Sequence, residues 1–331
     1  MTQRKRYRKT SKKNTPSSRW LRRLPLPVIL LVCLLSWLFP EQSQTLLGEL
    51  SFEIPAIREL TSRFGLRKGQ NTPGSENFEV HFLDVGQGLS VLVRSDTHAM
   101  LYDGGDRDAS SFVVSYLKDQ GIYTLDYVIA SHYDADHTSG LIGALNTFEV
   151  EHVLGPDYIH DSKTYDSFMN AAAAHGLMVE HPSPGDMYTL GDAGFTVLSP
   201  FEISEDSNNN SVAIRVVNKD NSFLLMGDAE KQSEEAICAS PLKLQSDVLC
   251  PGHHGSSSST CEEFLNDAKP KFAVISCGKD NEYGHPHRET LTRLAQHGVT
   301  VYRTDELGTI IAYSDGEEIW WELTKQKRTA A

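Results

Sequence analysis

Short apolar runs separated by polar, glycine-rich turns dominate the chain from Glu79 onward. The runs are a few residues long and rich in Val, Ile, Leu and Phe, which is typical of β-strands. They read FEVHFLDV, LSVLVRS, AMLYDGG, YVIASH, FTVLSP, SVAIRVV, SFLLMGD, DVLCPGHH, FAVISCG, TVYRTD and TIIAYS.

Longer stretches with apolar residues at helical spacing lie between several of these runs. They cover residues 110–120, 140–147, 164–175, 230–239 and 288–297. Because strands and helices are interleaved over the whole region, the pattern predicts one domain of mixed α and β structure rather than two unrelated domains.

The first 40 residues differ from the rest of the chain. Residues 1–23 carry ten Lys and Arg residues and no acidic residue, and residues 24–39, LPLPVILLVCLLSWLF, carry no charge. An apolar run behind a basic segment is typical of a membrane signal whose basic side stays in the cytoplasm. We expect an uncleaved signal anchor, which makes the protein a single-pass protein of the cell membrane with its globular domain outside. A cleaved signal peptide, which would leave the protein secreted, and a buried core helix are the alternatives, because sixteen residues are few for a spanning helix.

These patterns divide the chain into five parts. We expect a basic cytoplasmic tail (1–23), a membrane segment (24–39), a linker (40–77), one globular domain (78–323) and a short tail (324–331). The linker is assigned because its second half, LRKGQNTPGSENF, is rich in Gly, Pro, Ser and Asn.

Charge is distributed unevenly along the sequence. Ten of the 31 Lys and Arg residues lie between Arg4 and Arg23, whereas all 44 Asp and Glu residues lie at or after Glu41. The chain beyond the basic tail therefore has a formal charge of 21 − 44 = −23. Such a domain repels a polyanion such as nucleic acid unless basic patches or bound metal ions compensate.

Four cysteines follow the membrane segment. They are Cys238, Cys250, Cys261 and Cys277. An even number of cysteines in an exported domain allows one or two disulfides, and free cysteines in the core are the alternative. None of the four has the CxxC spacing of a thiolate zinc site.

The motif SHYDADHTSG, residues 131–140, follows the apolar run LDYVIA. It carries His132, Asp134, Asp136 and His137 at the end of a predicted buried strand. The carboxyl edge of a sheet is where ligands commonly bind, and imidazole and carboxylate groups are metal ligands. A polar turn before a helix at Gly140 would explain one His and one Asp, but it does not explain four such residues in six positions.

Three later runs also end in His or Asp. LLMGD ends at Asp228, VLCPGHH ends at His253 and His254, and FAVISCG leads into His285 and His287. Alone, Asp228 or His287 would be explained as the N-cap of the helix that follows it. Independent caps would not concentrate histidines at strand ends, so the clusters predict one shared site.

In their order along the chain, these motifs resemble the metallo-β-lactamase superfamily and, within it, the metallohydrolase domain of ComEC-type competence proteins. The resemblance extends over roughly residues 78–323 and rests on FLDVGQG, LYDGG, SHYDADHTSG, NNNSVAIRV, LLMGD, GHHGS, YGHPH and YRTDELGTI. It implies an α/β fold, the αββα metallo-β-lactamase sandwich, which is preceded here by one N-terminal membrane segment. It also implies a centre of two divalent metal ions at one edge of the sandwich.

The resemblance further implies which residues hold the ions. The candidates are His132 and Asp134 for one ion, Asp136 and His137 for the other, Asp228 between them, and one of His253 and His254, which the sequence does not separate, to complete the second site. The superfamily histidine that precedes the bridging aspartate is absent, and Asn209 or Asn210 is expected in its place. An oxygen-rich ligand set makes Mn²⁺ a candidate beside Zn²⁺.

Other motif residues are expected around the ions. Asp84 and Asp103 are expected to orient metal ligands or to stabilise turns, and Ser256 lies in a loop expected to line the mouth of the site. Leu89 follows GQG, where members of the family generally have an acidic residue. We interpret Leu89 as a change at the rim of the site.

Phosphodiester hydrolysis is the reaction that the resemblance implies. Asp136 would help to hold the ions that activate the attacking water, and His285 and His287 would contact the phosphate or protonate the leaving oxygen. The alternative for both histidines is a place in the outer shell of the metal ligands.

The expected function is that of an extracytoplasmic dinuclear metal-dependent phosphodiesterase, a ComEC-like nuclease with DNA as its substrate. One alternative is a hydrolase of small phosphodiesters or cell-wall choline-phosphate groups, in which Tyr133 and Tyr283 could receive the choline cation. Another is a non-catalytic, membrane-anchored binding module. With one apolar segment, the sequence is not expected to form a DNA-uptake channel, and it indicates no protein partner.

Overall fold

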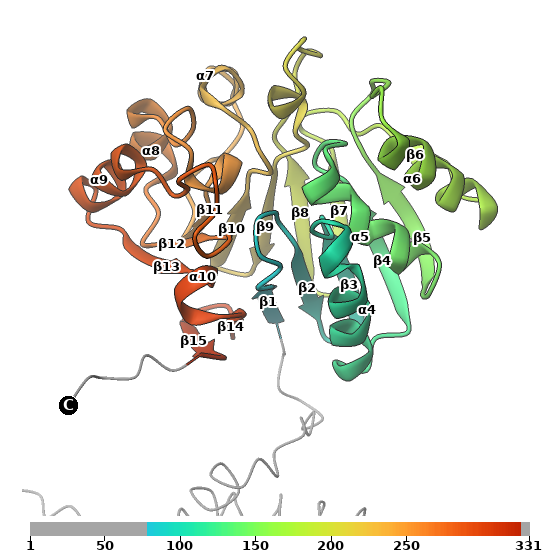
Figure 1. Cartoon of the computed structure of the whole chain (residues 1–331). Helices are drawn as coiled ribbons and strands as arrows, with labels where there is room; N and C mark the ends of the chain where they lie inside the picture. Colours follow the sequence, from blue (N-terminus) through green and yellow to red (C-terminus); the bar gives the residue numbers. More distant parts are fainter. Residues whose placement is uncertain (1–77, 326–331) are drawn as a thin grey trace, which may run out of the picture. The chain divides into compact units, whose positions relative to one another are not determined.

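Two mixed β-sheets packed face to face form the centre of the domain (Figure 1). The computed structural model describes residues 78–325. In spatial order, the first sheet consists of β15 (Ile319–Leu323), β14 (Ile310–Ser314), β1 (Phe78–Phe82), β2 (Val91–Ser95), β3 (His98–Tyr102), β4 (Thr124–Ile129), β5 (Glu149–Leu154) and β6 (Val179–Glu180). The second consists of β13 (Thr300–Arg303), β12 (Phe272–Ile275), β11 (Val248–Cys250), β10 (Asn221–Leu225), β9 (Ile214–Asn218), β8 (Ala193–Val197) and β7 (Met187–Leu190).

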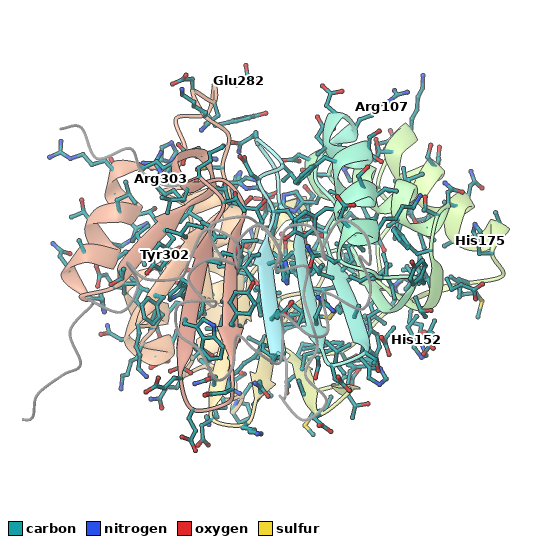
Figure 2. The ribbon with its side chains drawn as sticks, turned by 90° about the horizontal axis from the view of Figure 1, so that it is seen from below. Arg107, His152, His175, Glu282, Tyr302 and Arg303 are labelled. Atoms are coloured by element: carbon teal, nitrogen blue, oxygen red, sulfur yellow. The ribbon has the colours of Figure 1, made fainter. Side chains whose placement is uncertain are left out.

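Helices cover the outer faces of the two sheets (Figure 1). The first sheet is covered by α4 (Ser110–Asp119), α5 (Ala135–Leu145) and α6 (Lys163–Ala174), and the second by α7 (Lys231–Cys238), α8 (Glu262–Ala268) and α9 (Arg288–Gln296). The short elements are η2 (Arg107–Ala109), η3 (Ser207–Asn210), η4 (Gly252–Gly255) and α10 (Thr304–Leu307). Figure 2 shows His152 and His175 at one end of the domain and Tyr302 and Arg303 at the other.

Three apolar layers hold the sandwich together. The central layer, between the sheets, includes Phe82 and Tyr102 of the first sheet and Phe223 of the second, all fully buried. Strand β1 shows how this layer forms, because its alternate residues Phe78, Val80 and Phe82 all lie in it. The two outer layers join each sheet to its helices.

The predicted αββα sandwich is therefore confirmed for the described residues. The expected membrane segment (24–39) lies outside them. Among residues 78–325, no helix has both the length and the apolar character that crossing a bilayer requires. Cys238, Cys250, Cys261 and Cys277 are all free thiols, so the structure contains none of the disulfides that the sequence allowed between them.

Local structure departs from the sequence prediction mainly at polar segments. Helix α5 begins at Ala135 rather than at Gly140, so Asp136 and His137 lie in its first turn. The prediction failed there because polar residues in a first turn carry no apolar periodicity. Strands β5 and β15 were also missed, because exposed residues interrupt their apolar patterns.

Parallel pairing brings several strand ends to the same edge of each sheet. Strands β3, β4 and β5 are parallel in the first sheet, and β10, β11, β12 and β13 are parallel in the second. The loops that leave the carboxyl ends of these strands carry the His and Asp motifs. Ligand-binding residues commonly gather at such an edge.

The first turns of α5 pack directly against the backbone of the loop after β3. Gly104 N–H donates to the His137 carbonyl at 2.7 Å, and Gly140 N–H donates to the Gly105 carbonyl at 3.0 Å. A Cβ atom on Gly140 would lie 1.8 Å from the carbonyl oxygen of Gly104, which no side-chain movement can relieve. Gly104 and Gly140 thus permit the close backbone contact between α5 and the loop after β3, and this contact fixes the position of His137.

Gly140→Ala is expected to lower the free energy of unfolding by roughly 2–3 kcal/mol, because the new methyl group meets backbone. Gly143→Ala is the matched control on the same helix, since a Cβ atom there would meet the movable Oγ of Ser110 at 2.4 Å. Denaturant unfolding of the full chain measures both variants. Equal losses of stability would show that the backbone contact at Gly104 is not the constraint.

Candidate metal centre

His and Asp side chains from both sheets meet at the strand ends. Asp103 follows β3, His132 follows β4, Asp228 follows β10 and His254 follows β11, while His137 comes from α5. All five are buried. Because the donors belong to segments far apart in the sequence, the fold rather than local structure assembles the cluster.

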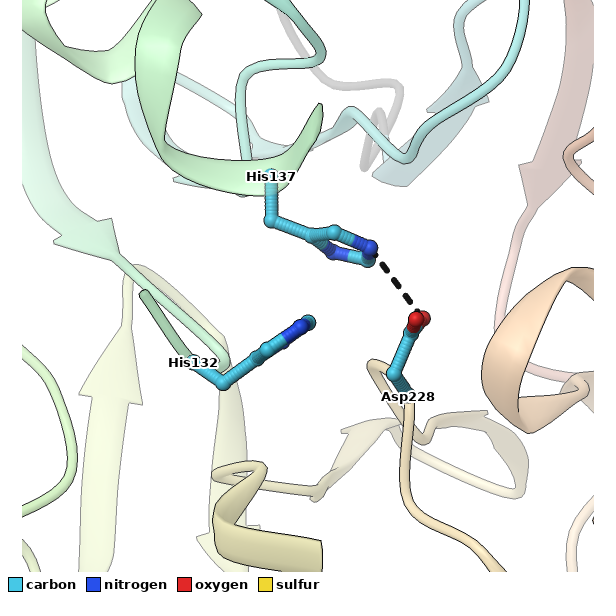
Figure 3. A group of neighbouring side chains, drawn as sticks. All are labelled: His132, His137 and Asp228. Carbon is cyan, nitrogen blue, oxygen red and sulfur yellow. Dashed lines mark ion pairs between the residues drawn. The ribbon is translucent and has the colours of Figure 1, made fainter. Parts of the chain in front are cut away.

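Three ligand atoms from His132, His137 and Asp228 form one group (Figure 3). They lie within 4.8 Å of one another, and His137 Nε2 is 3.1 Å from Asp228 Oδ1. Imidazole nitrogens and a carboxylate oxygen gathered this closely form a candidate ligand set for one metal ion.

A second group consists of Asp136, His137 and His254. His254 Nε2 lies 3.3 Å from His137 Nε2 and 3.4 Å from Asp136 Oδ2. It is also 3.6 Å from Asp228 Oδ1. His137 belongs to both groups, and Asp228 of the first group lies next to His254 of the second, so the two sites adjoin.

Each of the three buried histidines is held through Nδ1. His137 Nδ1 contacts Asp103 Oδ2 at 2.8 Å, and His254 Nδ1 contacts the Ser276 carbonyl at 3.0 Å. His132 Nδ1 lies 3.0 Å from the Ser131 hydroxyl. Partners at Nδ1 orient the ring and leave Nε2 as the ligand atom, which is the usual arrangement around a metal-binding histidine.

Two buried atoms in the cluster have no hydrogen-bond partner among the described residues. They are His132 Nε2 and Asp228 Oδ1. Asp228 Oδ1 is close to His137 Nε2, but the two atoms are not aligned as a hydrogen bond requires. Leaving such atoms unpaired is costly, and a divalent cation bound to both would remove the cost. The donor set therefore fits a metal ion.

The electrostatics of the cluster also suit a cation. Burial lowers the pKa of His137, but the nearby carboxylates of Asp228, Asp103 and Asp136 outweigh it and hold that pKa well above its usual range. Conversely, burial raises the pKa of Asp228, yet His137 and His254 keep it well below its usual range. The carboxylates therefore stay ionised and require positive charge beside them.

Asp134 lies at the exposed side of the first group. Its Oδ2 is 3.7 Å from His132 Nε2, and its Oδ1 is 3.2 Å from His160 Nε2. Sequence reasoning missed His160, which lies in the loop between β5 and α6 and contacts the Ser162 hydroxyl through Nδ1. A single histidine outside any motif gives no signal in the sequence that could have identified it.

The structure separates His253 from His254. Both have left-handed backbone angles, with φ of 50° and 54°, and these angles turn the two rings in different directions. His253 Nδ1 contacts Glu230 Oε1 at 2.8 Å, and His253 Nε2 lies 3.9 Å from Asp228 Oδ2. His254 thus belongs to the second group, whereas His253 approaches the opposite oxygen of Asp228.

Several residues that were expected near the ions have other hydrogen-bond or ion-pair partners. Asp84 forms an ion pair with Lys325, so it does not orient a metal ligand. Asn210 bonds the backbone of Ser204 through both ends of its amide and does not replace the missing superfamily histidine.

The other candidate for that role, Asn209, uses its Oδ1 to accept backbone N–H groups of Glu230 and Ser233. Ser256 contacts the Ser258 hydroxyl within its own loop. The Leu89 side chain is buried between the sheets, and its backbone N–H donates to the Asp136 carbonyl at 3.2 Å, so the residue lies directly beside the second group.

His285 and His287 differ in position. The His285 ring centroid is 5.2 Å from that of His253 and 6.1 Å from that of His254, so it lies beside the cluster. His287 instead accepts the Ser257 backbone N–H at Nδ1, and its Nε2 contacts the Tyr283 carbonyl. Both ring nitrogens of His287 thus have backbone partners, while its ring centroid lies 4.8 Å from that of His285, and a role of His287 in catalysis stays a prediction.

His285 is a neutral imidazole at pH 7. Burial, reinforced by the neighbouring His254, His253 and His287, lowers its pKa to about 4. Positive charge bound at the cluster would lower that pKa further. In this form His285 can donate a hydrogen bond to a phosphoryl oxygen, which is one of the two roles expected from the sequence, and proton transfer to the leaving oxygen stays a prediction.

Comparison with known proteins agrees with this structure. The family model described as the metallo-beta-lactamase superfamily matches residues 83–279, more than half of the chain. ComE operon protein 3 of Bacillus subtilis is 33% identical over 255 aligned residues, covering 71% of this chain and 33% of that protein. Competence protein ComA of Neisseria gonorrhoeae is 32% identical over 232 residues, with coverages of 69% and 31%. Recombination protein 2 of Haemophilus influenzae is 32% identical over 256 residues, with coverages of 75% and 30%.

This chain spans about a third of the length of the curated relatives it matches. The superfamily match covers both of the ligand groups described above. Members of the superfamily are generally metal-dependent hydrolases. The chain belongs to the metallo-β-lactamase superfamily, and its curated relatives are ComEC-type competence proteins.

Proposed function

We propose that the chain is a dinuclear metal-dependent phosphodiesterase that acts on DNA. The observation that carries the proposal is the pair of adjoining ligand groups that share His137 and lie beside Asp228. Two adjacent metal sites are the usual arrangement in enzymes that hydrolyse phosphodiesters by in-line displacement.

The ligands divide between the two ions as follows. His132, Asp134 and Asp228 would hold the first ion, and Asp136, His137 and His254 the second, with Asp228 shared. His253 is the candidate for the remaining first-site position, because its ring is held by Glu230 and its Nε2 approaches Asp228 Oδ2. The mixture of carboxylates and imidazoles suits both Zn²⁺ and Mn²⁺.

Hydrolysis of a phosphodiester needs a water nucleophile, and the side chains of this protein determine the surroundings of that water. When bound, the two ions would lower the pKa of a coordinated water to near neutrality and polarise the phosphoryl oxygens. Asp103 keeps the His137 ring oriented, and Asp134 and Asp136 present their carboxylates on the open side of the cluster. Neutral His285 supplies a hydrogen-bond donor next to the site.

DNA is the proposed substrate because the names of the relatives refer to competence and recombination, which are processes that involve DNA. One of them is named a competence protein and another a recombination protein, and the matches to them cover 69% and 75% of this chain. The formal charge of −23 beyond the basic tail opposes binding of a polyanion. Bound metal ions reduce that repulsion at the site itself, where the phosphate must approach.

A small phosphodiester or a choline-phosphate group is the second candidate. The acidic domain favours it, and Tyr283 is exposed and stacks on His285 with 5.6 Å between the ring centroids. Tyr133 does not contribute, since it is fully buried and its hydroxyl donates to the Pro156 carbonyl. One exposed aromatic ring could still receive a cationic headgroup.

The third alternative is a non-catalytic binding module. The two adjoining groups of metal-ligand side chains argue against it.

We also propose that the domain works outside the cytoplasmic membrane. Support comes from the basic residues 1–23 followed by the uncharged residues 24–39. A phosphodiesterase anchored in this way would meet DNA or cell-wall material arriving from outside.

The full chain is expected to bind about two Zn²⁺ or Mn²⁺ ions after removal of metal by a chelator. His254→Ala should lose about one ion, and Asp228→Asn should weaken both sites because it contacts both groups. His175→Ala is the matched control, since this exposed histidine lies at the far end of the domain (Figure 2). Elemental analysis and metal titration measure the stoichiometry. Folded chain that takes up no metal would contradict the proposal.

The metal-loaded full chain is expected to cleave single- or double-stranded DNA. Asp136→Asn should lower the rate at least about 100-fold, because each metal site contributes several kcal/mol of transition-state stabilisation. The assay compares both forms of DNA with a chromogenic phosphodiester, and His175→Ala is the control. Turnover of the small ester alone would favour the second candidate, and no turnover by metal-loaded protein would favour the binding module.

A further inference from the structure

The loop between β12 and α9 brings His285 to the metal centre. Its backbone is held by Asn281, whose Nδ2 donates to the carbonyls of Gly278 and His285 and whose Oδ1 accepts the His285 N–H at 2.9 Å. These three bonds fix where the loop runs. They leave open which ring nitrogen of His285 carries the proton.

Gln87 is the side chain that contacts the ring. Its Oε1 accepts the Gly278 backbone N–H at 3.1 Å, and its Nε2 lies 3.5 Å from His285 Nδ1. The first contact determines the orientation of the amide, because only the oxygen can accept an N–H group. The NH₂ group must therefore face His285.

This orientation determines the tautomer of His285. An amide NH₂ only donates, so Nδ1 of the neutral ring has to accept, and the proton is on Nε2. The distance of 3.5 Å is at the long end of hydrogen bonds, which commonly shorten in catalytic sites once substrate binds. Within residues 78–325, the His285 ring has no other hydrogen-bond partner.

The loop that carries Gln87 is itself held against the β12 end. Ser276 Oγ donates to the Gly88 carbonyl at 2.7 Å. A Cβ atom on Gly278 would lie 2.8 Å from Gln87 N, so the two backbones are in direct contact. The position of the Gln87 amide relative to His285 is thus built into the fold.

We propose that Gln87 is a positioning residue that holds His285 as the Nε2–H tautomer and so provides a hydrogen-bond donor for a phosphoryl oxygen of the substrate. The proposal rests on the proposed phosphodiesterase function. In this form His285 stabilises negative charge on the phosphoryl group through its Nε2–H. The proposal also gives the glutamine of the GQG motif a role in positioning His285, in addition to the turn that the two glycines form.

Gln87→Glu tests the proposal with an almost isosteric change. The carboxylate can still accept the Gly278 N–H, but it also accepts from His285 and therefore favours the proton on Nδ1. The measurement is imidazole ¹⁵N NMR of the zinc-loaded full chain labelled at histidine, with the His285 signals identified by His285→Ala. We expect an unprotonated Nδ1 and a protonated Nε2 in the natural chain, and a protonated Nδ1 in Gln87→Glu. A protonated Nδ1 in the natural chain, or a tautomer that Gln87→Glu leaves unchanged, would overturn the proposal.

Kinetics separate a positioning role from a merely structural one. Gln87→Glu is expected to lower kcat/KM by about 100-fold, as the loss of one oriented donor does, and to have little further effect in the His285→Ala background. An equal loss in both backgrounds would mean that Gln87 acts by holding the loop, which would overturn the proposal. If the natural chain hydrolyses no phosphodiester, the proposed function fails, and the NMR measurement still decides the relation between Gln87 and His285.

Discussion

The burial of carboxylates where the strand ends of the two sheets meet is the constraint on which the rest of the structure depends. Asp103 and Asp228 are almost inaccessible to solvent, and they follow strands of opposite sheets. A buried carboxylate is tolerated only if positive charge or hydrogen-bond donors surround it. His137 lies between the two and contacts both. The same cluster thus joins the halves of the sandwich and concentrates the negative charge that attracts divalent cations.

Close backbone contacts and unusual backbone angles at the strand ends position these side chains. Gly104 and Gly140 allow α5 to approach the loop after β3, and Gly252 allows close contact with Ala229, whose carbonyl oxygen would lie 2.1 Å from a Cβ atom at position 252. His254 has a left-handed conformation that side chains other than glycine adopt at a cost of about 1–2 kcal/mol. Strain of this kind is commonly stored at functional sites, because the surrounding packing enforces a geometry that local preference would not choose.

Sequence reasoning predicted the fold well where apolar patterns were regular. The αββα architecture followed from the family motifs, and helices such as α4 and α9 began at the predicted residue, because their apolar faces are continuous. The start of α5 and the strands β5 and β15 could not be predicted. In these segments polar or exposed residues interrupt the periodicity, and pairing with neighbouring strands or loops decides the structure.

The sequence by itself determined which chemical groups stand at the strand ends, because His and Asp residues directly follow the apolar runs, and parallel pairing of the strands then brings these ends to the same edge of each sheet. Only the tertiary structure decided which of them face one another. The left-handed backbone angles of His253 and His254 turn their two rings in different directions. Lys325 forms an ion pair with Asp84, and Gln87 contacts His285 although the two residues are nearly 200 positions apart in the sequence. The direction of a side chain depends on its own backbone angles and on partners distant in the chain, and neither can be inferred from the spacing of residues in a motif.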